Sequence, residues 1–244
     1  MTTRPPRTLP EAPSHSREID AFLNTVREVA APASGAARLV FALDATMSRQ
    51  PSWDMASRVQ VGMFDAAAGI GGLAVQLVYF RGFRECRASR WVADPRRLAE
   101  LMGKIRCEAG ETQIGRVLGH VLDETAREPV RALVYVGDAV EESLDSLCEK
   151  AGRLGLLGVK TFMFHEGGSE RVAAAYGEIA RLTGGAAMAF DSRAPAPLAA
   201  LVRAVAAYAG GGRAALDRLA AREEGARRLL AAIPALTGPG SARR

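Results

Sequence analysis

Strand-like and helix-like hydrophobic patterns alternate along most of the chain, from residue 38 to residue 208. Short apolar runs bounded by turn residues predict strands, and apolar residues spaced three and four apart predict helices. This alternation favours a doubly wound, Rossmann-like α/β fold, in which helices cover both faces of a mostly parallel sheet. The expected strands are 38–43, 73–80, 83–92, 131–136, 159–164 and 186–190, and the expected helices are 53–68, 95–105, 112–126, 142–154, 170–183 and 196–208.

One pair of strands departs from parallel order. Gly82 interrupts the run from Leu73 to Val92, and only two or three residues are left to form a turn. Arg87 and Arg90 place charge on the second half of this run. The pattern therefore predicts a hairpin whose second strand, 83–92, is an antiparallel edge strand, because charged side chains discourage pairing between sheet edges.

Segments at both ends extend the central pattern. The sequence predicts three parts: a proline-rich mobile leader with an amphipathic helix over 16–30 (residues 1–35), an α/β domain (36–210) and a basic helical extension (211–244) with a surface helix over 213–233. The apolar faces of these extra N- and C-terminal helices need a partner. They are expected at the bottom or flank of the sheet, away from the carboxyl ends of the strands, or in a contact between subunits of a homo-oligomer.

Charge and targeting signals limit the classes of function. The net charge is +5, and residues 211–244 hold seven arginines against three acids, so the central domain is close to neutral. A nucleic-acid surface would gather basic and aromatic residues on one face, so none is expected. No secretory h-region and no 18-residue apolar span occurs, so we expect a cytoplasmic protein with no membrane segment. The three cysteines lack Cys-x-x-Cys spacing, which indicates neither disulfides nor zinc. The 29 arginines against three lysines hint at a GC-rich bacterial genome.

Oxygen-bearing side chains follow the ends of two expected strands. The first strand opens onto Asp44, and hydroxyls follow at Thr46 and Ser48. Alternate residues of an extended turn can direct these three side chains at one point. Thr112 begins an expected helix, and Asp138 follows the strand 131–136. Magnesium prefers oxygen ligands in octahedral geometry, so the five side chains suggest one metal site.

This set resembles the metal-ion-dependent adhesion site (MIDAS) of von Willebrand factor A (VWA) domains. The family's pattern is Asp-x-Ser-x-Ser after the first strand, then a distant threonine and a distant aspartate. Thr46 departs from it, keeping the hydroxyl but adding a methyl group. The resemblance covers roughly residues 36–209 and implies that Asp44, Thr46, Ser48, Thr112 and Asp138 bind Mg²⁺ (or Mn²⁺). It also implies a binding module, not an enzyme, whose ion holds a Glu or Asp carboxylate of a protein partner.

Two other interpretations compete with the adhesion site. In the first, Asp44 and Thr112 are helix N-caps and do not bind a metal. Alternatively, the chain resembles haloacid-dehalogenase-type Mg²⁺-dependent phosphatases, with Asp44 as the nucleophile. That alternative lacks its usual general acid, because Thr46 stands at the position. It also leaves Thr112 without a role. The lysine of that family is hard to place, because none of the three lysines follows the strand or helix where the family has it.

Glu141 and Glu142 follow Asp138 closely. One interpretation makes them solvated carboxylates at a helix start, where the helix dipole favours negative charge. The other makes them supporting groups for the ion.

Overall fold

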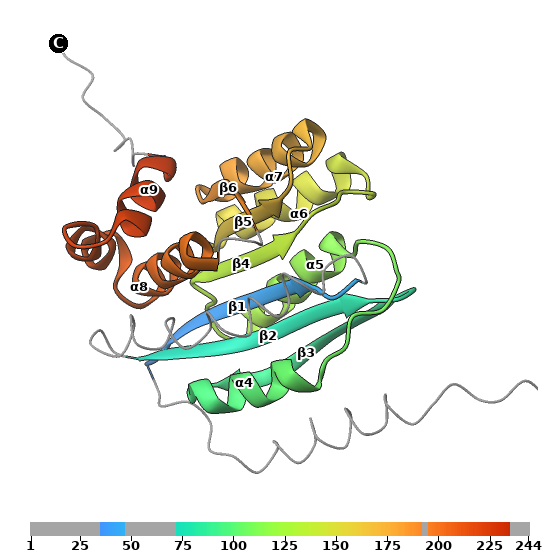
Figure 1. Ribbon diagram of the computed structural model, residues 1–244, viewed down its shortest axis with the longest axis horizontal. Helices are drawn as coiled ribbons and strands as arrows, with labels where there is room; N and C mark the ends of the chain where they lie inside the picture. The colour runs from blue at the N-terminus through green and yellow to red at the C-terminus, as the bar shows by residue number, and fades with distance from the viewer. Residues whose placement is uncertain (1–34, 47–71, 192–194, 235–244) are drawn as a thin grey trace, which may run out of the picture. The chain divides into compact units, whose positions relative to one another are not determined.

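The computed structural model describes residues 35–46, 72–191 and 195–234 (Figure 1). Four of the five proposed metal ligands lie in these ranges. Ser48 lies outside the described residues, as do the expected helices 16–30 and 53–68.

Within the described residues the core is a six-stranded sheet in the order β3-β2-β1-β4-β5-β6. All neighbouring strands run parallel except β2 and β3. The doubly wound α/β architecture with one antiparallel edge strand is therefore confirmed (Figure 1). The strands are β1 (Ala37–Asp44), β2 (Leu73–Arg81), β3 (Glu85–Val92), β4 (Ala132–Gly137), β5 (Lys160–Glu166) and β6 (Ala186–Phe190), and the helices are α4 (Pro95–Lys104), α5 (Ile114–Arg127), α6 (Leu144–Leu156), α7 (Glu170–Thr183), α8 (Pro195–Ala220) and α9 (Glu224–Ala232).

The central strands are buried on both faces, which explains their near-continuous apolar sequences. Successive side chains of β1 point to opposite faces of the sheet. Val40 and Ala42 belong to one core, which they share with apolar side chains of α5, α6 and α7. Helix α8 instead packs against β1, β2 and β4. Helices therefore cover both faces of the central strands.

The β2–β3 hairpin confirms the predicted antiparallel edge. The turn holds three residues, Gly82, Phe83 and Arg84, because β3 begins at Glu85 and not at residue 83 as predicted. Gly82 and Arg84 have φ angles of 55° and 72°. Glycine enters this left-handed region freely, but arginine does so at a cost, so the turn is held by its surroundings.

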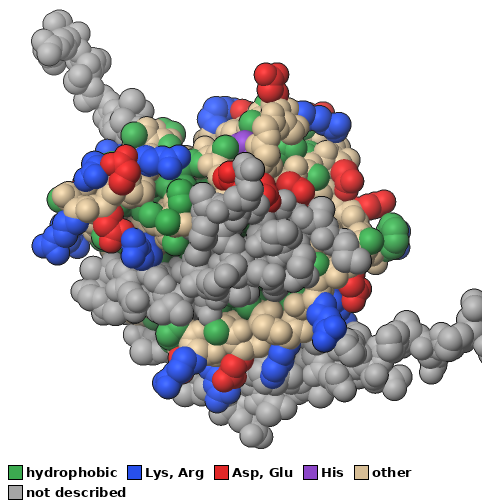
Figure 2. All heavy atoms as spheres, viewed as in Figure 1, with side chains coloured by type: hydrophobic (Ala, Val, Ile, Leu, Met, Phe, Trp, Pro, Cys, Tyr) green, Lys and Arg blue, Asp and Glu red, His purple; other side chains and the backbone are tan. Residues whose placement is uncertain are grey.

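The expected surface helix over 213–233 is divided in the structure at residues 221–223. Helix α8 is interrupted at Gly211 and Gly212, where the backbone leaves helical geometry, and α9 begins after an extended Glu223. A Cβ atom on Gly225 would lie 2.5 Å from the Cβ of Ala200, so the backbones of α8 and α9 approach closely. These helices therefore pack within the chain. Figure 2 shows many Lys and Arg side chains on their surface, at the upper left.

A buried charge network joins the start of β1 to α5. The Arg38 guanidinium lies 2.7 Å from the Glu124 carboxylate and 3.9 Å from the centre of the Trp91 ring. The Trp91 indole also donates a hydrogen bond to Glu124, at 2.7 Å. Both charged side chains are almost fully buried. Their pairing supplies the partners that buried charges require.

Among the described residues, no helix is long and apolar enough to cross a membrane.

Candidate functional site

The first candidate ligand sits where β1 ends. Asp44 is the last residue of the strand, and the backbone N–H of Thr46 donates to its carboxylate at 2.8 Å. Asp44 and Thr46 are buried, at 3% and 8% exposure. The hydrogen bond fixes the turn after β1. It also keeps the carboxylate at the carboxyl edge of the sheet.

The second aspartate follows the neighbouring strand. Leu43 and Val136 are paired in the β1–β4 register, so Asp44 and Asp138 leave the sheet at nearly the same level. Strand order changes direction between β1 and β4, and ligands of open α/β sheets bind at such a switch point. The two predicted carboxylates therefore occupy the edge where this fold binds ligands.

Two buried tyrosines support the loop after β4. The Tyr176 hydroxyl donates to the backbone oxygen of Ala139 at 3.1 Å, and its ring contacts Tyr135 edge to face. A Cβ atom on Gly137 would lie 2.8 Å from the Tyr176 hydroxyl and 2.9 Å from the Tyr135 ring. Glycine is thus required at 137 for this packing. Burial raises the pKa of Tyr135 well above its ordinary value, and the charges of Tyr176 and Asp44 act in the same direction.

The loop before α5 brings Thr112 to the same edge. The backbone N–H of Glu108 donates to the Ala45 oxygen at 3.0 Å, which ties this loop to the turn after β1. Thr112 is buried at 7% exposure. Its N–H donates to the Glu141 carboxylate at 2.8 Å, and its hydroxyl accepts from the Glu141 N–H at 3.2 Å. The structure therefore joins the loops of Asp44, Thr112 and Asp138 by direct hydrogen bonds.

Glu142 strengthens the same connection. Its two carboxylate oxygens accept from the backbone N–H groups of Ile114 (2.5 Å) and Gly115 (2.8 Å). Within α5 the residue at the N-cap position, Gln113, makes no such side-chain bond. Burial raises the pKa of Glu142 above its ordinary value, although the two amide hydrogen bonds act in the opposite direction. Glu141 is exposed and Glu142 is half-buried, but their carboxylates bond the Thr112 loop and the start of α5 and do not cap their own helix.

The donor set suits a hard cation. Carboxylate and hydroxyl oxygens are ligands that Mg²⁺ accepts. Among the described residues, no group of three or more His, Cys, Asp or Glu side chains could hold a metal. The predicted site does not require such a group, because its only carboxylates are Asp44 and Asp138 and its other donors are hydroxyls. The residues present therefore fit Mg²⁺ or Mn²⁺ better than zinc.

We expect that replacing Glu142 by alanine will weaken Mg²⁺ binding by about 10- to 100-fold, as loss of groups that orient metal ligands commonly does. The physical reason is that Thr112 loses part of the clamp between α5 and the loop after β4. Loss of the α5 cap should also cost about 1 kcal/mol of stability. Isothermal calorimetry and thermal unfolding measure the two effects. Glu149→Ala, an exposed change on α6, is the matched control; equal affinities in the two variants would refute the clamp.

The supporting side chains were harder to predict than the candidate ligands. Nothing in the local sequence of Tyr176 points to a loop 37 residues earlier. His120 bonds Gln76 at 2.8 Å, and His165 is buried in β5. All three cysteines are free thiols.

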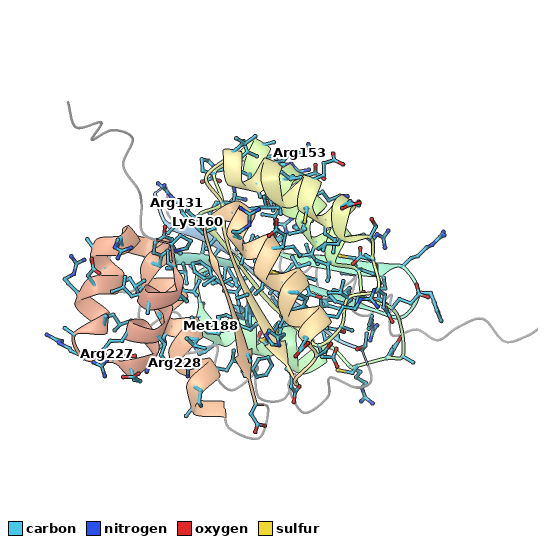
Figure 3. The ribbon with its side chains drawn as sticks, turned by 90° about the horizontal axis from the view of Figure 1, so that it is seen from above. Arg131, Arg153, Lys160, Met188, Arg227 and Arg228 are labelled. Carbon is cyan, nitrogen blue, oxygen red and sulfur yellow. The ribbon has the colours of Figure 1, made fainter. Side chains whose placement is uncertain are left out.

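A hollow lies at the end of the sheet opposite the candidate metal site. It has a volume of about 460 Å³ and is bordered by Arg131, Lys160, Tyr208 and the glycines at the break in α8. Figure 3 shows Arg131 and Lys160 close together where β4 and β5 begin. None of the four predicted metal ligands that the structure describes lines this hollow. The candidate metal site is therefore separate from it.

Comparison with known proteins identifies the fold. No family model and no curated protein matches the sequence. Among solved structures, the VWA domain of SpRpn10 is 11% identical with a TM-score of 0.53, and covers 64% of this chain and 89% of its own. An aerotolerance-related membrane protein from Bacteroides fragilis is 19% identical with a TM-score of 0.51, and covers 64% of this chain and 92% of its own. This chain has the VWA fold.

A third neighbour carries a metal. Proximal thread matrix protein 1 from the mussel byssus, solved with a zinc-occupied MIDAS motif, is 16% identical with a TM-score of 0.53. The alignment covers 70% of this chain and 46% of that protein. At these identities the likeness concerns the fold. It shows that this fold accommodates an ion at a MIDAS in that relative.

Proposed function

We propose that this chain is a protein-binding module that uses Mg²⁺ or Mn²⁺ to hold an acidic side chain of a partner protein. The observation that carries the proposal is the joining of three loops at the carboxyl edge of a VWA-fold sheet. These loops bear Asp44 and Thr46, Thr112, and Asp138. Ser48, outside the described residues, completes the proposed set.

The five proposed side-chain donors would leave one of the six positions of an octahedral ion for a partner. A bound divalent ion would supply an electrophilic position that accepts a carboxylate oxygen. Asp44 and Asp138 together contribute two negative charges, and the hydroxyls of Thr46, Ser48 and Thr112 contribute only dipoles. Glu141 already bonds the Thr112 backbone, and Glu142 bonds the start of α5. Their hydrogen bonds hold these two carboxylates in supporting positions, and a partner's aspartate or glutamate fills the remaining place.

Among the residues that the structure describes, none near Asp44 supports the phosphatase alternative. Lys160 begins β5, at the opposite end of the sheet, and Lys150 bonds Ser146 on α6. Thr46 stands where a general acid would be required. Thr112 would have no catalytic task, although it occupies the centre of the loop connections.

The proposal predicts capture of a partner that depends on the ion. Immobilised full-length chain should retain a protein in Mg²⁺ and release it in chelator, because the ion links the two carboxylate-bearing surfaces. Asp44→Ala should retain none. Asp217→Ala, an exposed aspartate on α8, should behave like the wild type. A retained protein that ignores both chelator and Asp44→Ala would contradict a role for the ion.

A parallel assay separates binding from catalysis. In Mg²⁺, the chain should neither hydrolyse a generic phosphatase substrate nor bind fluoroberyllate, which mimics an acyl phosphate. Reproducible turnover that Asp44→Asn abolishes would instead establish the phosphatase.

A further inference from the structure

The tip of the β2–β3 hairpin exposes a large aromatic side chain. Phe83 is 80% exposed, although burying such a side chain is worth about 1.5 to 3 kcal/mol. The other large apolar side chains exposed among the described residues are leucines: Leu144, Leu156 and Leu157. Among these exposed side chains of the described residues, Phe83 is the aromatic one, and it is available to contact another molecule.

The hairpin tip lies at the same edge of the sheet as the candidate metal site. Strands β1 and β2 are parallel, and Asp44 pairs with Phe80 in their register. Phe83 follows Phe80 by three residues, so it projects from the sheet beyond the level at which Asp44 ends β1. A protein that reaches the ion at the carboxyl edge thus also approaches the Phe83 ring.

The tip is bonded to the loop that carries Thr112. A Cβ atom on Gly110 would lie 2.3 Å from the Gly82 backbone, so the loop and the turn are in direct contact. The Glu111 N–H donates to the Gly82 oxygen at 3.4 Å. The Gln113 amide donates to the oxygens of Arg81 and Glu85, at 3.4 Å and 3.3 Å. The Thr112 loop thus anchors both strands of the hairpin next to its tip.

The backbone of the tip is held in a costly conformation. Arg84 has a φ of 72°, the left-handed region in which a non-glycine residue costs about 1 to 3 kcal/mol. The Arg116 guanidinium bonds the Arg84 oxygen and the Gln113 side chain, which fixes the turn from the direction of α5. An aromatic residue on a backbone that is held in this way loses little backbone entropy on binding, and aromatic residues, including phenylalanine, are enriched in protein interfaces.

We propose that Phe83 is a specificity-determining contact for the partner. The occupant is a protein segment with an aspartate or glutamate for the ion and, at a fixed distance, an apolar side chain that packs on Phe83. This inference rests on the proposed metal-dependent binding. The acidic residue gives dependence on the ion, and the apolar residue distinguishes one acidic segment from another.

Selection from a library of displayed peptides in Mg²⁺ tests the inference with four forms of the full-length chain. The wild type should enrich peptides that combine an acidic residue with an apolar residue at constant spacing. Phe83→Ala should still enrich acidic residues but lose the apolar preference, and a wild-type-selected peptide should bind it at least about 10-fold more weakly. Leu156→Ala, a 90% exposed leucine at the far end of α6, should match the wild type. Asp44→Ala should enrich neither.

The outcomes separate the two proposals. Two results would overturn the role of Phe83 alone. In one, the apolar preference survives Phe83→Ala. In the other, the wild type shows a Mg²⁺-dependent acidic preference but no apolar preference. Acidic peptides that bind equally with chelator or with Asp44→Ala overturn the metal-dependent function, and the inference falls with it. Thermal unfolding of Phe83→Ala should equal that of the wild type, since an exposed ring contributes little to folding.

Discussion

Replacing Asp44 or Asp138 by alanine should weaken Mg²⁺ binding by more than about 100-fold while the fold remains intact. Loss of groups that only orient ligands commonly costs 10- to 100-fold, so loss of a direct carboxylate ligand should cost more. Each aspartate supplies one of the two negative charges proposed for the site. Asp44 ends β1 and Asp138 follows β4, and the core contacts of these strands do not depend on either carboxylate. Isothermal calorimetry measures the affinity, and circular dichroism checks the fold.

A matched variant distinguishes ligation from a general effect of charge. Asp217→Ala removes one exposed carboxylate from α8 and should leave Mg²⁺ affinity unchanged. Asp44→Asn is a second test, since it retains an oxygen that can accept from the Thr46 N–H and removes only the charge. Unchanged Mg²⁺ affinity in both alanine variants would remove the site assignment.

The largest loss of stability is expected for Glu124→Ala, about 3 kcal/mol in the free energy of unfolding. The carboxylate bonds the buried Arg38 guanidinium and the Trp91 indole, and its removal leaves a buried charge poorly compensated. Urea denaturation measures the change. Glu128→Ala is the control, because that carboxylate is exposed and lies 3.5 Å from Arg38, so its loss should cost less than about 1 kcal/mol. Equal losses in the two variants would contradict the importance of burial.

The same network predicts how stability depends on pH. Burial alone would raise the pKa of Glu124, but the Trp91 hydrogen bond and the positive charge of Arg38 lower it overall. A carboxyl whose pKa is lower in the folded state stabilises the protein above its unfolded pKa. This stabilisation is lost as pH falls through the folded pKa. Glu124→Gln should therefore reduce stability at neutral pH and flatten the loss of stability in acid, as urea midpoints at several pH values would reveal.

Hydrophobic periodicity predicted the sheet because local sequence carries that information. The strand ending at Asp44 and the strand preceding Asp138 both read as continuous apolar runs, as buried parallel strands do. The charged run after Gly82 indicated an antiparallel edge, and β3 occupies it. Element ends were less accurate, since the turn at Phe83 and Arg84 depends on hydrogen bonds from distant residues.

The C-terminal helices show where local patterns are insufficient. Apolar spacing over 213–233 was consistent with one helix and did not reveal its partner. The structure divides this region and packs α9 on α8, with an ion pair of 2.7 Å between Arg203 and Glu223. The approach of Gly225 to Ala200 selects this arrangement, and that contact joins residues 25 positions apart. The N-terminal helix 16–30 stays a prediction.

The candidate site also combines residues that the sequence predicts with residues that only tertiary contacts reveal. Residue type and order suggested Asp44, Thr46, Ser48, Thr112 and Asp138, because oxygen donors after strand ends converge in this kind of fold. The clamp of Glu142 on α5 and the support of Tyr176 for Ala139 arise only from tertiary contacts. Sequence reasoning thus predicts a donor set, and the structure supplies the framework that holds its loops together.

A crystal structure of the full chain grown in Mg²⁺ tests the central claim most directly. The account predicts one ion between the loops of Asp44, Thr112 and Asp138, with oxygen ligands at about 2.0 to 2.1 Å. It also predicts that Ser48 contributes to the coordination shell and that a water molecule or a carboxylate from another molecule occupies the outward position. An ion bound elsewhere, or no ion between these loops at saturating Mg²⁺, would contradict the account.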